Sequence, residues 1–508
     1  MIETELKLLI PPQAVRKLAS HPLLKGRAAG TRSRLYSIYF DTPALDLWRQ
    51  GVALRLRRDG RRWVQTVKGG GAVQGGLHQR VELEEEVAGP VPDFSRIGNH
   101  GLAEAFASAP LRARIEPAFV TDFNRVSRLL ELDSGVAVEA SMDRGEIRSG
   151  KRTEAVCELE LELKSGAPEQ LYDFALRLAE ALPLSIENRS KAERGFALAR
   201  GERARPVKAR PADLRGDLSV NDAFKAVMWA SLAHLLANER GMLEGADLEY
   251  LHQMRVALRR LRSALGVFSP PLPEAAVAPL TGEMKWLAGS LGPARDWDVF
   301  MTETLPPIAA EFGTQGELGA FSARCEKLRR YANGRARRAL RSPRYRRLTL
   351  SLAAWLVSER WRTELDADRR LAFGAPVADF AAAVLEKRYG QARKRGRKLA
   401  GLTTAELHRL RIAIKKYRYA ADFFAGLYER KPARQALKRL ARLQDILGAM
   451  NDAVTVANLM AQGFDGAAGR HVPEAKGILL GWSRGRAATL KRELKSAWKD
   501  FRAGEKFW

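Results

Sequence analysis

The sequence predicts two domains of different fold class: an antiparallel β domain first, forming a barrel or sandwich, and an all-helical domain after it. Three observations support this division. Charged and apolar residues alternate in many short segments of residues 1–200, which is the period of a strand. The rest of the chain is rich in Ala, Leu and Arg at helical spacing. With 508 residues, the chain is also too long for one ordinary hydrophobic core.

The β domain is predicted from successive strand patterns. These patterns cover residues 37–42, 52–58, 63–68, 80–85, 119–132, 136–148 and 153–164. Asp59-Gly60 is a hairpin signal, and helices are expected at 11–20 and 168–181. The glycine-rich stretch 69–76 is expected to be a flexible connector. It is not a phosphate-binding P-loop, because no Gly-Lys-Ser/Thr follows it.

Charged residues recur at the two ends of this β domain. Glu3-Thr4-Glu5-Leu6-Lys7 opens the chain, and residues 158–164 repeat the pattern as Glu-Leu-Glu-Leu-Glu-Leu-Lys. Alternate side chains of a strand point the same way, so carboxylates and an ammonium share one face. A linear triphosphate needs this mixture, because Arg and Lys hold phosphoryl oxygens and a hard divalent cation takes carboxylate ligands. A solvated sheet face shows the same alternation, so both orientations remain open.

An internal repeat organises the helical part of the chain. Residues 202–217 contain proline and charged residues and show no helical or strand periodicity, so they are interpreted as a linker. Residues 251–262 resemble residues 407–418, and residues 291–296 resemble 447–452 at the same offset of 156. Two matches at one offset predict two related helical bundles.

Each copy of the repeat carries a basic stripe at helical spacing. The stripes consist of His252, Arg255, Arg259 and Arg262 in the first copy and of His408, Arg411, Lys415 and Arg418 in the second. Neither 251–268 nor 407–421 contains an acid, so like charges repel unless an anion lies among them. The stripes are therefore candidates for polyanion binding, although a solvated basic face is a common alternative.

The net charge of +27 is placed unevenly. Residues 1–200 contain 30 Lys and Arg against 27 Asp and Glu, and the remaining 56 basic and 32 acidic residues give the second part +24. Nucleic acid, an acidic membrane surface and polyphosphate are the partners that such a charge attracts. Only two cysteines, Cys157 and Cys325, are present, which argues against a disulfide framework. No apolar run is long enough to span a bilayer, so a cytoplasmic location without membrane partners is expected.

The motifs of residues 1–200 resemble the CYTH family, the triphosphate tunnel metalloenzymes. The resemblance starts with Glu3-Thr4-Glu5-Leu6-Lys7, passes through Leu54-Arg55-Leu56-Arg57 and Gln79-Arg80-Val81-Glu82, and ends with Ser190-Lys191-Ala192-Glu193-Arg194-Gly195. It implies an eight-stranded antiparallel barrel that forms a tunnel. Members include inorganic triphosphatases, thiamine-triphosphatases and class IV adenylyl cyclases.

The resemblance also implies roles for individual residues. Triphosphate would be bound by Lys7, Arg55, Arg57, Lys68, Arg80, Arg125 and Lys191. Metal, Mg²⁺ or Mn²⁺, would be bound by Glu3, Glu5, Glu160, Glu162 and Asp143. Catalysis would involve Glu3, Glu5, Lys7 and Glu82. Which carboxylate of Glu158, Glu160 and Glu162 contacts metal stays open, since all three share a face.

Residues 218–508 resemble the CHAD family, on the motif His-x-x-Arg-x-x-x-Arg/Lys-Arg/Lys-x-Arg of both stripes. This resemblance implies two four-helix bundles related by a pseudo-two-fold axis, and binding of long-chain inorganic polyphosphate. One departure is that Arg295 of the first copy becomes Asn451 in the second. The expected domains are therefore a tunnel domain at 1–201, a linker at 202–217 and a polyphosphate-binding helical domain at 218–508.

The leading hypothesis is a metal-dependent inorganic triphosphatase that converts tripolyphosphate into pyrophosphate and phosphate. The alternatives are a non-catalytic polyphosphate-binding protein and an enzyme acting on an organic triphosphate, for which Tyr36, Tyr39, Trp48 or Trp63 could stack a base. A nucleic-acid binder is disfavoured, because few aromatic residues interleave the basic stripes.

Overall fold

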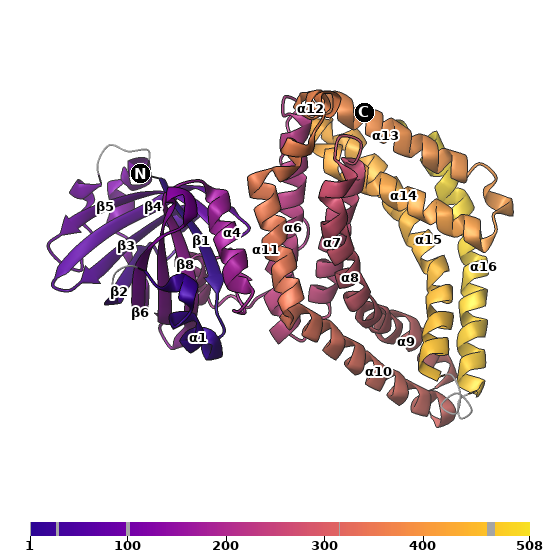
Figure 1. Ribbon diagram of the computed structural model, residues 1–508. Coiled ribbons are helices and arrows are strands. Elements are labelled where there is room, and N and C mark those ends of the chain that lie inside the picture. The colour runs from indigo at the N-terminus through magenta and orange to yellow at the C-terminus, as the bar shows by residue number, and fades with distance from the viewer. Residues whose placement is uncertain (1, 27–29, 98–101, 314, 465–472) are drawn as a thin grey trace. The chain divides into compact units, whose positions relative to one another are not determined.

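The computed structural model describes residues 2–26, 30–97, 102–313, 315–464 and 473–508. The chain forms two compact units (Figure 1). The first unit contains residues 1–205 and 342–359, and the second contains 206–341 and 360–508.

Eight antiparallel strands of the first unit close into a barrel. They are β1 (Ile2–Leu9), β2 (Thr31–Asp41), β3 (Val52–Asp59), β4 (Arg62–Gln74), β5 (Leu77–Val87), β6 (Glu116–Glu131), β7 (Ala137–Ser149) and β8 (Arg152–Ser165). Their order is β5-β4-β3-β2-β6-β7-β8-β1, and β5 pairs back onto β1. The short strand β9 (Ser185–Ile186) adds to β1. Closure removes the open sheet edges, so the barrel alternative is confirmed over the sandwich.

The glycine-rich stretch is mostly strand. β4 continues through Gly69 and Gly71 to Gln74, and its pairing with β5 shifts register between Gly69 and Ala72. At Gly71 the backbone has φ +92°, and a Cβ atom would lie 1.8 Å from the carbonyl oxygen of Gln79. The prediction of a flexible connector at 69–76 is therefore wrong for most of this stretch, because the glycines serve a bulged strand.

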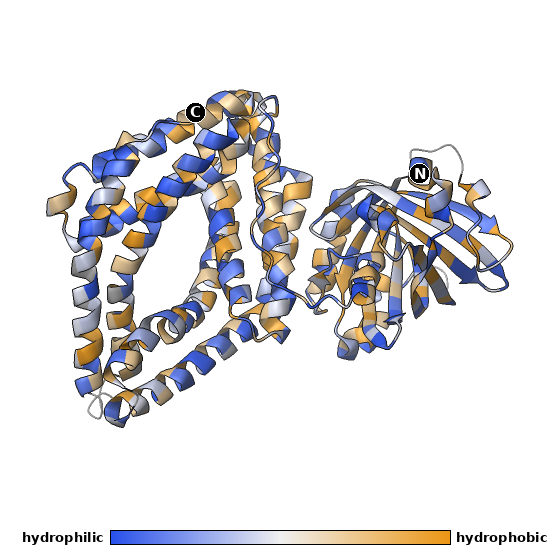
Figure 2. Ribbon diagram, turned by 180° about the vertical axis from the view of Figure 1, so that it is seen from behind, coloured by the Kyte–Doolittle hydropathy of each residue, from blue (hydrophilic) through white to orange (hydrophobic). Residues whose placement is uncertain are grey.

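Apolar side chains of the strands pack on the outer wall of the barrel. Leu54, Leu56 and Val67 form a buried cluster with Leu47 and Phe106, which come from short helical segments. The alternation of hydrophilic and hydrophobic residues along the strands is visible in Figure 2. Because the apolar face is covered from outside, the charged residues between them point into the barrel.

Helices pack against the barrel. They are α1 (Val15–Ala19), α2 (Asp46–Arg49), α3 (Ala109–Arg112), α4 (Pro168–Ala179), α5 (Lys191–Arg200) and, from far along the chain, α11 (Pro343–Ser358). The helix α4 buries Leu171, Tyr172 and Phe174, contacts β1 and β8, and is itself packed against α11. The strands that carry the two repeated charge patterns are thus supported from outside by a helix.

The helix α5 packs against apolar side chains on the inner face of the barrel. Phe196 contacts Phe119 with ring centroids 5.0 Å apart, and both belong to a buried cluster that includes Tyr39 and Ile147. A Cβ atom at Gly195 would lie 2.0 Å from the Phe119 ring, so glycine permits this close approach. The same helix starts at Lys191, whose ammonium reaches the charged part of the interior.

The second unit contains two sets of four long helices. The first set is α6 (Val220–Glu244), α7 (Glu249–Val267), α8 (Glu274–Val299) and α10 (Gly316–Arg341), and the second is α13 (Val377–Arg395), α14 (Thr404–Phe424), α15 (Arg430–Phe464) and α16 (Pro473–Ala503). The shorter helices α9 (Leu305–Phe312) and α12 (Ala367–Gly374) accompany them. Each helix of the second set begins within one residue of the position that the offset of 156 gives. The repeat inferred from two motifs therefore extends to the whole architecture.

The two sets meet through the helices that carry the basic stripes, since α7 packs against α14. Segment 202–215 contains no helix or strand, and the side-chain amide of Asn238 on α6 makes two hydrogen bonds with the backbone of Val207, at 2.9 and 3.0 Å. None of the described helices combines the length and the apolar content of a membrane span.

Candidate functional sites

Four strands and one helix bring a first charged network together inside the barrel. The Lys7 ammonium contacts the Glu5 carboxylate at 2.7 Å and also contacts Glu160. Arg125 donates two hydrogen bonds of 2.7 Å to Asp143 in a forked arrangement and contacts Glu160 as well. Burial alone would raise the pKa of Glu160, but Lys191, Lys7 and Arg125 hold it well below its ordinary value. The carboxylate is therefore ionised at neutral pH.

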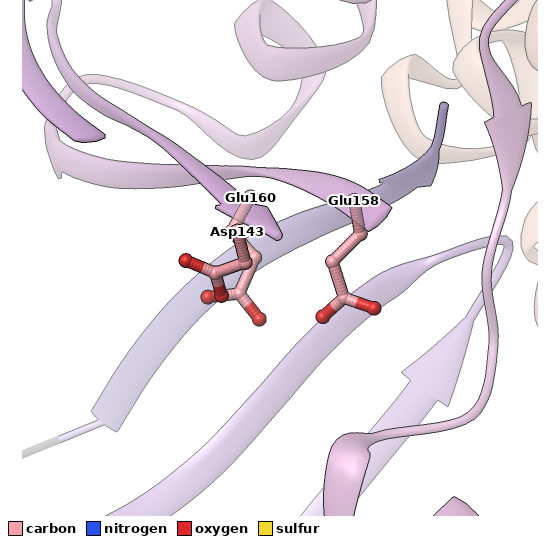
Figure 3. A group of neighbouring side chains, drawn as sticks. All are labelled: Asp143, Glu158 and Glu160. Carbon is pink, nitrogen blue, oxygen red and sulfur yellow. The ribbon is translucent and has the colours of Figure 1, made fainter. Parts of the chain in front are cut away.

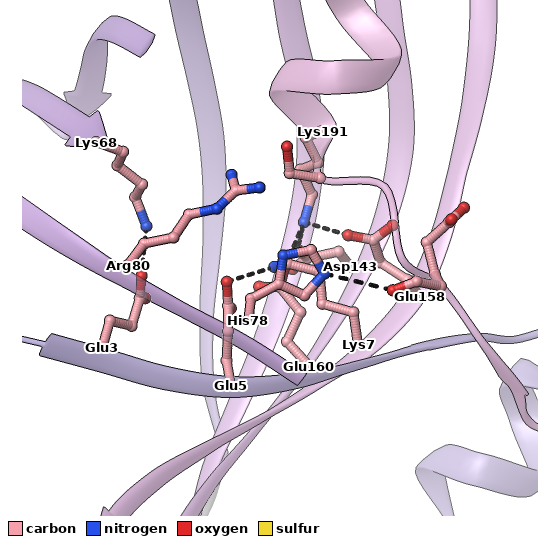
Figure 4. A network of polar contacts seen from close by, with 12 residues as sticks. Glu3, Glu5, Lys7, Lys68, His78, Arg80, Asp143, Glu158, Glu160 and Lys191 are labelled. Atoms are coloured by element: carbon pink, nitrogen blue, oxygen red, sulfur yellow. Dashed lines mark hydrogen bonds and ion pairs between the residues drawn. The ribbon is translucent and has the colours of Figure 1, made fainter. Parts of the chain in front are cut away.

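Lys191 occupies the centre of a carboxylate cluster. Oxygen atoms of Asp143, Glu158 and Glu160 lie within 4.8 Å of one another (Figure 3). The Lys191 Nζ atom lies 2.6 Å from Asp143, 2.5 Å from Glu158 and 2.9 Å from Glu160 (Figure 4). Arg194 further pairs with Glu158 at 2.9 Å. An ammonium group thus takes the position where a metal cation would otherwise bind these three acids.

A second network lies on the strands across the barrel. Lys68 contacts Glu3 at 2.6 Å and Glu82 at 2.8 Å, and Arg55 donates a hydrogen bond of 3.1 Å to Glu82. Arg80 is 3.5 Å from Glu193 at the start of α5. The predicted phosphate ligands are therefore held in place by carboxylates, which fixes long and flexible side chains before a substrate arrives.

A row of three acids crosses neighbouring strands. Glu5 on β1 lies opposite Glu162 on β8, and Glu162 lies opposite Glu139 on β7. Like charges directly opposite one another are destabilising in a sheet. Burial, with added repulsion from Glu3 and Glu139, raises the pKa of Glu162 in spite of its ion pair with Lys164 at 2.6 Å.

Two acids of this row, Glu5 and Glu162, fit a hard divalent cation together with Glu3. Mg²⁺ and Mn²⁺ prefer carboxylate oxygens, and Glu3, Glu5 and Glu162 supply them on one inner face. Glu3, Glu5 and Glu162 each pair with one lysine. Asp143 and Glu160 fit a cation less well, because two or more cations already pair with each of them. The predicted metal set thus divides in the structure into an acidic row and a neutralised cluster.

Arg57 differs from the other interior cations. Its Nε atom is buried without a hydrogen-bond partner, and no ion pair to it is found among the described residues. Burial, followed by repulsion from Arg55 and Arg125, lowers the pKa of Arg57 to about 10. An unpaired guanidinium among other cations is stabilised by an incoming anion.

The structure therefore brings Glu3, Glu5, Lys7 and the other predicted tunnel residues to one interior, where most of them belong to ion-pair networks and Arg57 stands apart. Sequence reasoning missed two members. Arg194 lies one helical turn after Lys191, a spacing that places both on one helix face. Glu158 was left undecided among three candidates and proves to be the partner of both.

The second candidate site is the basic cluster of Arg255, Arg259, Arg411 and Lys415 on α7 and α14. Burial, followed by repulsion from Arg411, Arg259 and Arg255, lowers the pKa of Lys415 to about 8. The Nε atoms of Arg255 and Arg411, at equivalent repeat positions, are both buried without hydrogen-bond partners. The two stripes thus converge on one cluster that has a surplus of positive charge.

Acidic residues flank the basic cluster in both copies of the repeat. Asp296 lies 4.0 Å from Arg255, and Arg295 beside it pairs with Glu303 at 3.3 Å. Burial raises the pKa of Asp296 and of its repeat counterpart Asp452. These aspartates belong to the motif that revealed the repeat, but the sequence did not show that they face the arginines.

The remaining stripe residues are His252, His408, Arg262 and Arg418. Burial, with repulsion from Arg295, Arg259 and Arg255, lowers the pKa of His252. His408 is exposed, with its Nδ1 atom 3.3 Å from the Asn451 side-chain oxygen. Arg262 is exposed and Arg418 half-buried, and neither forms a hydrogen bond or ion pair within the described parts of the chain.

Two family models match the chain: the CYTH domain over residues 1–196 and the CHAD domain over residues 226–461. The fold and the two charged sites thus define a tunnel-type barrel joined to a helical repeat domain. The chain carries a CYTH domain followed by a CHAD domain.

Two known proteins are similar to parts of this chain. A Haemophilus influenzae inorganic triphosphatase is 32% identical over 201 residues, which are 39% of this chain and 54% of that protein. The match therefore spans about half of that relative's length. The crystal structure of the CHAD domain from Ricinus communis shares 33% identity at a TM-score of 0.51, covering 60% of this chain and 99% of that one.

Proposed function

We propose that the barrel hydrolyses linear inorganic triphosphate with the help of a divalent cation. The observation that carries this proposal is the composition of the interior: cations held by carboxylates, an acidic row that fits Mg²⁺ or Mn²⁺, and Arg57 without an anionic partner. The name of the Haemophilus influenzae relative supports the same activity.

The reaction needs water to attack a terminal phosphorus atom, with cleavage of the bridging P–O bond and release of phosphate and pyrophosphate. Lys7, Lys68, Arg55, Arg57, Arg80, Arg125 and Lys191 would hold the phosphoryl oxygens. Glu82, paired with both Lys68 and Arg55, would keep these two cations in position. In-line displacement of this kind is accelerated mainly by positioning and by charge stabilisation.

Glu3, Glu5 and Glu162 would hold the divalent cation. When bound, such a cation neutralises phosphate charge and lowers the pKa of its water. Glu3 and Glu5 would orient the attacking water and accept its proton, which requires them to be ionised. Lys7 stays protonated beside Glu5, because Glu160 and Glu5 overcome the effect of burial and raise the pKa of Lys7.

Interior packing favours an inorganic over an organic triphosphate. Tyr39 stacks on Phe119 with ring centroids 4.4 Å apart, and Trp48 packs on Phe196 at 5.0 Å. Trp63 packs against the apolar cluster on the outer wall. Three of the four aromatic residues that could stack a base are thus engaged elsewhere.

A substrate panel tests the proposal. Phosphate release is measured from tripolyphosphate, ATP, thiamine triphosphate and pyrophosphate, each with Mg²⁺, with Mn²⁺ and with excess chelator. We expect metal-dependent turnover of tripolyphosphate well above that of the others. Binding of tripolyphosphate without turnover under all metal conditions would replace this proposal with the non-catalytic one.

We propose in addition that the basic cluster binds long-chain inorganic polyphosphate. The buried, unpartnered Nε atoms of Arg255 and Arg411 support this second function. Competition between labelled polyphosphate and RNA at a fixed salt concentration tests this second function. Salt screens the attraction of either polyanion to the basic cluster in the same way. The free thiols of Cys157 and Cys325 fit a cytoplasmic location, which cell fractionation would check.

A further inference from the structure

His78 is a buried titratable residue of the barrel interior that the proposed reaction does not use. It lies opposite Glu5 in the antiparallel pairing of β5 with β1. Strand alternation places it on the same face as Arg80 and Glu82, two of the interior residues. Its side chain stands among those of Glu5, Lys7 and Glu160 in Figure 4.

The hydrogen bonding of His78 leaves one ring nitrogen without a partner. The residue is 1% exposed. Its Nε2 atom lies 3.4 Å from the carbonyl oxygen of Glu187, and a carbonyl only accepts, so Nε2 carries the hydrogen. Nδ1 then keeps its lone pair, and this atom is buried with no hydrogen-bond partner. A buried acceptor without a donor is costly, which marks a position where a donor belongs.

The surroundings of His78 keep its ring uncharged. Burial, followed by the nearby charges of Lys7 and Arg80, lowers the pKa of His78 to about 2. The neighbouring lysines and arginines can only donate hydrogen bonds, and the neighbouring carboxylates repel phosphate. A neutral imidazole nitrogen accepts a hydrogen bond from water without either repulsion or a competing ion pair.

We propose that His78 is a positioning residue, which orients the attacking water by accepting its hydrogen bond at Nδ1 beside Glu5. This inference rests on the proposed triphosphatase function. It adds an imidazole acceptor for the water, so that a carboxylate takes one hydrogen and His78 fixes the other. No proton is transferred to the ring, and the atoms of the reaction remain those given above.

Two amide substitutions in the full chain separate the two ring nitrogens. In His78→Asn the amide lies near the place of Nδ1, so its oxygen can still accept from the water. In His78→Gln the amide reaches the place of Nε2 and keeps the bond to Glu187 but not the acceptor at Nδ1. We expect His78→Gln to lower kcat for tripolyphosphate about tenfold at little changed KM, and His78→Asn to recover most of this loss.

Inhibition by pyrophosphate and thermal melting show whether each variant keeps a folded site. Equal turnover of His78→Gln and wild type would overturn the inference. Equal losses of kcat in both variants, accompanied by weaker inhibition by pyrophosphate, would overturn it as well. If the wild type itself releases no phosphate from tripolyphosphate, the proposed function fails. If only the ranking of the two variants fails, the proposed function stands without a role for His78.

Discussion

The barrel interior and the basic cluster both contain several cationic side chains, but they differ in how far carboxylates neutralise them. In the barrel, Lys7, Lys68, Arg125 and Lys191 each contact at least two carboxylates. In the basic cluster, Lys415 has a pKa lowered to about 8 by burial and three arginines. One region is balanced and the other has a surplus of positive charge.

The difference matches what catalysis and binding require. A catalytic site must hold its groups in fixed positions before the substrate arrives, and ion pairs to carboxylates provide this order. Acids also leave room for a metal cation, which a purely basic site would repel. A binding surface for a long polyanion gains more from uncompensated charge, because each phosphate then replaces a repulsion with an attraction.

Removing one carboxylate from the barrel interior should have the largest effect on catalytic activity. We expect Glu5→Gln to reduce phosphate release from tripolyphosphate by about 100-fold or more, because a metal ligand and a water-orienting group are lost together. Polyphosphate affinity of the basic cluster should stay unchanged. The matched control is Glu85→Gln, at an exposed position on the opposite face of β5. Activity of Glu5→Gln within twofold of wild type would refute the role of Glu5.

Substitution of Arg57, which is unpaired, and of Arg125, which pairs with two carboxylates, should give the next largest effects on activity and stability. Arg57→Met should lower kcat/KM for tripolyphosphate roughly ten- to a hundredfold while leaving the melting temperature equal or higher, because a buried, unpaired cation is removed. Arg125→Met should instead destabilise the fold by roughly 3 kcal/mol, because it leaves Asp143 and Glu160 without this partner. Thermal or urea unfolding measures both. A destabilised Arg57→Met would contradict the comparison.

The sequence predicted the parts of this molecule that depend on local pattern. Alternation located the strands of the barrel, and the offset of 156 found in two motifs relates the starts of the two helix sets to within one residue. Alternation could not decide which strand face points inward, because both faces of a covered barrel wall are buried. The family resemblance indicated that orientation, and the outer apolar cluster around Leu54 and Leu56 now accounts for it.

Long-range contacts were beyond the reach of the sequence. Lys191 lies at the centre of Asp143, Glu158 and Glu160 only because α5 enters the barrel beside Phe119. The glycines at 69–71 suggested flexibility by composition, yet pairing with β5 makes them strand. Alternation puts His78 in phase with Arg80 and Glu82, but its unpartnered Nδ1 atom is recognised only from the structure.

Adjacent lysines on α14 test the surplus-charge region. Lys415 belongs to the basic cluster, whereas Lys416 is exposed on another face of the same helix. We expect Lys415→Met to weaken polyphosphate binding about tenfold, the equivalent of one charge-assisted contact. Lys416→Met removes the same net charge and should have a much smaller effect. Fluorescence anisotropy with labelled polyphosphate measures both, and equal losses would mean that only net charge matters.

The smallest effect is a pH dependence of binding that originates in Lys415. Because its pKa is about 8 without ligand, Lys415 is cationic below that pH and becomes neutral as the pH rises through it. A bound polyanion favours the charged form, so binding above pH 8 must also take up a proton, and affinity falls several-fold between about pH 7 and 9. Lys415→Arg keeps its charge throughout this range and should flatten the profile. The comparison cancels titration of the polyphosphate itself, so parallel profiles of the two proteins would exclude Lys415 as the origin.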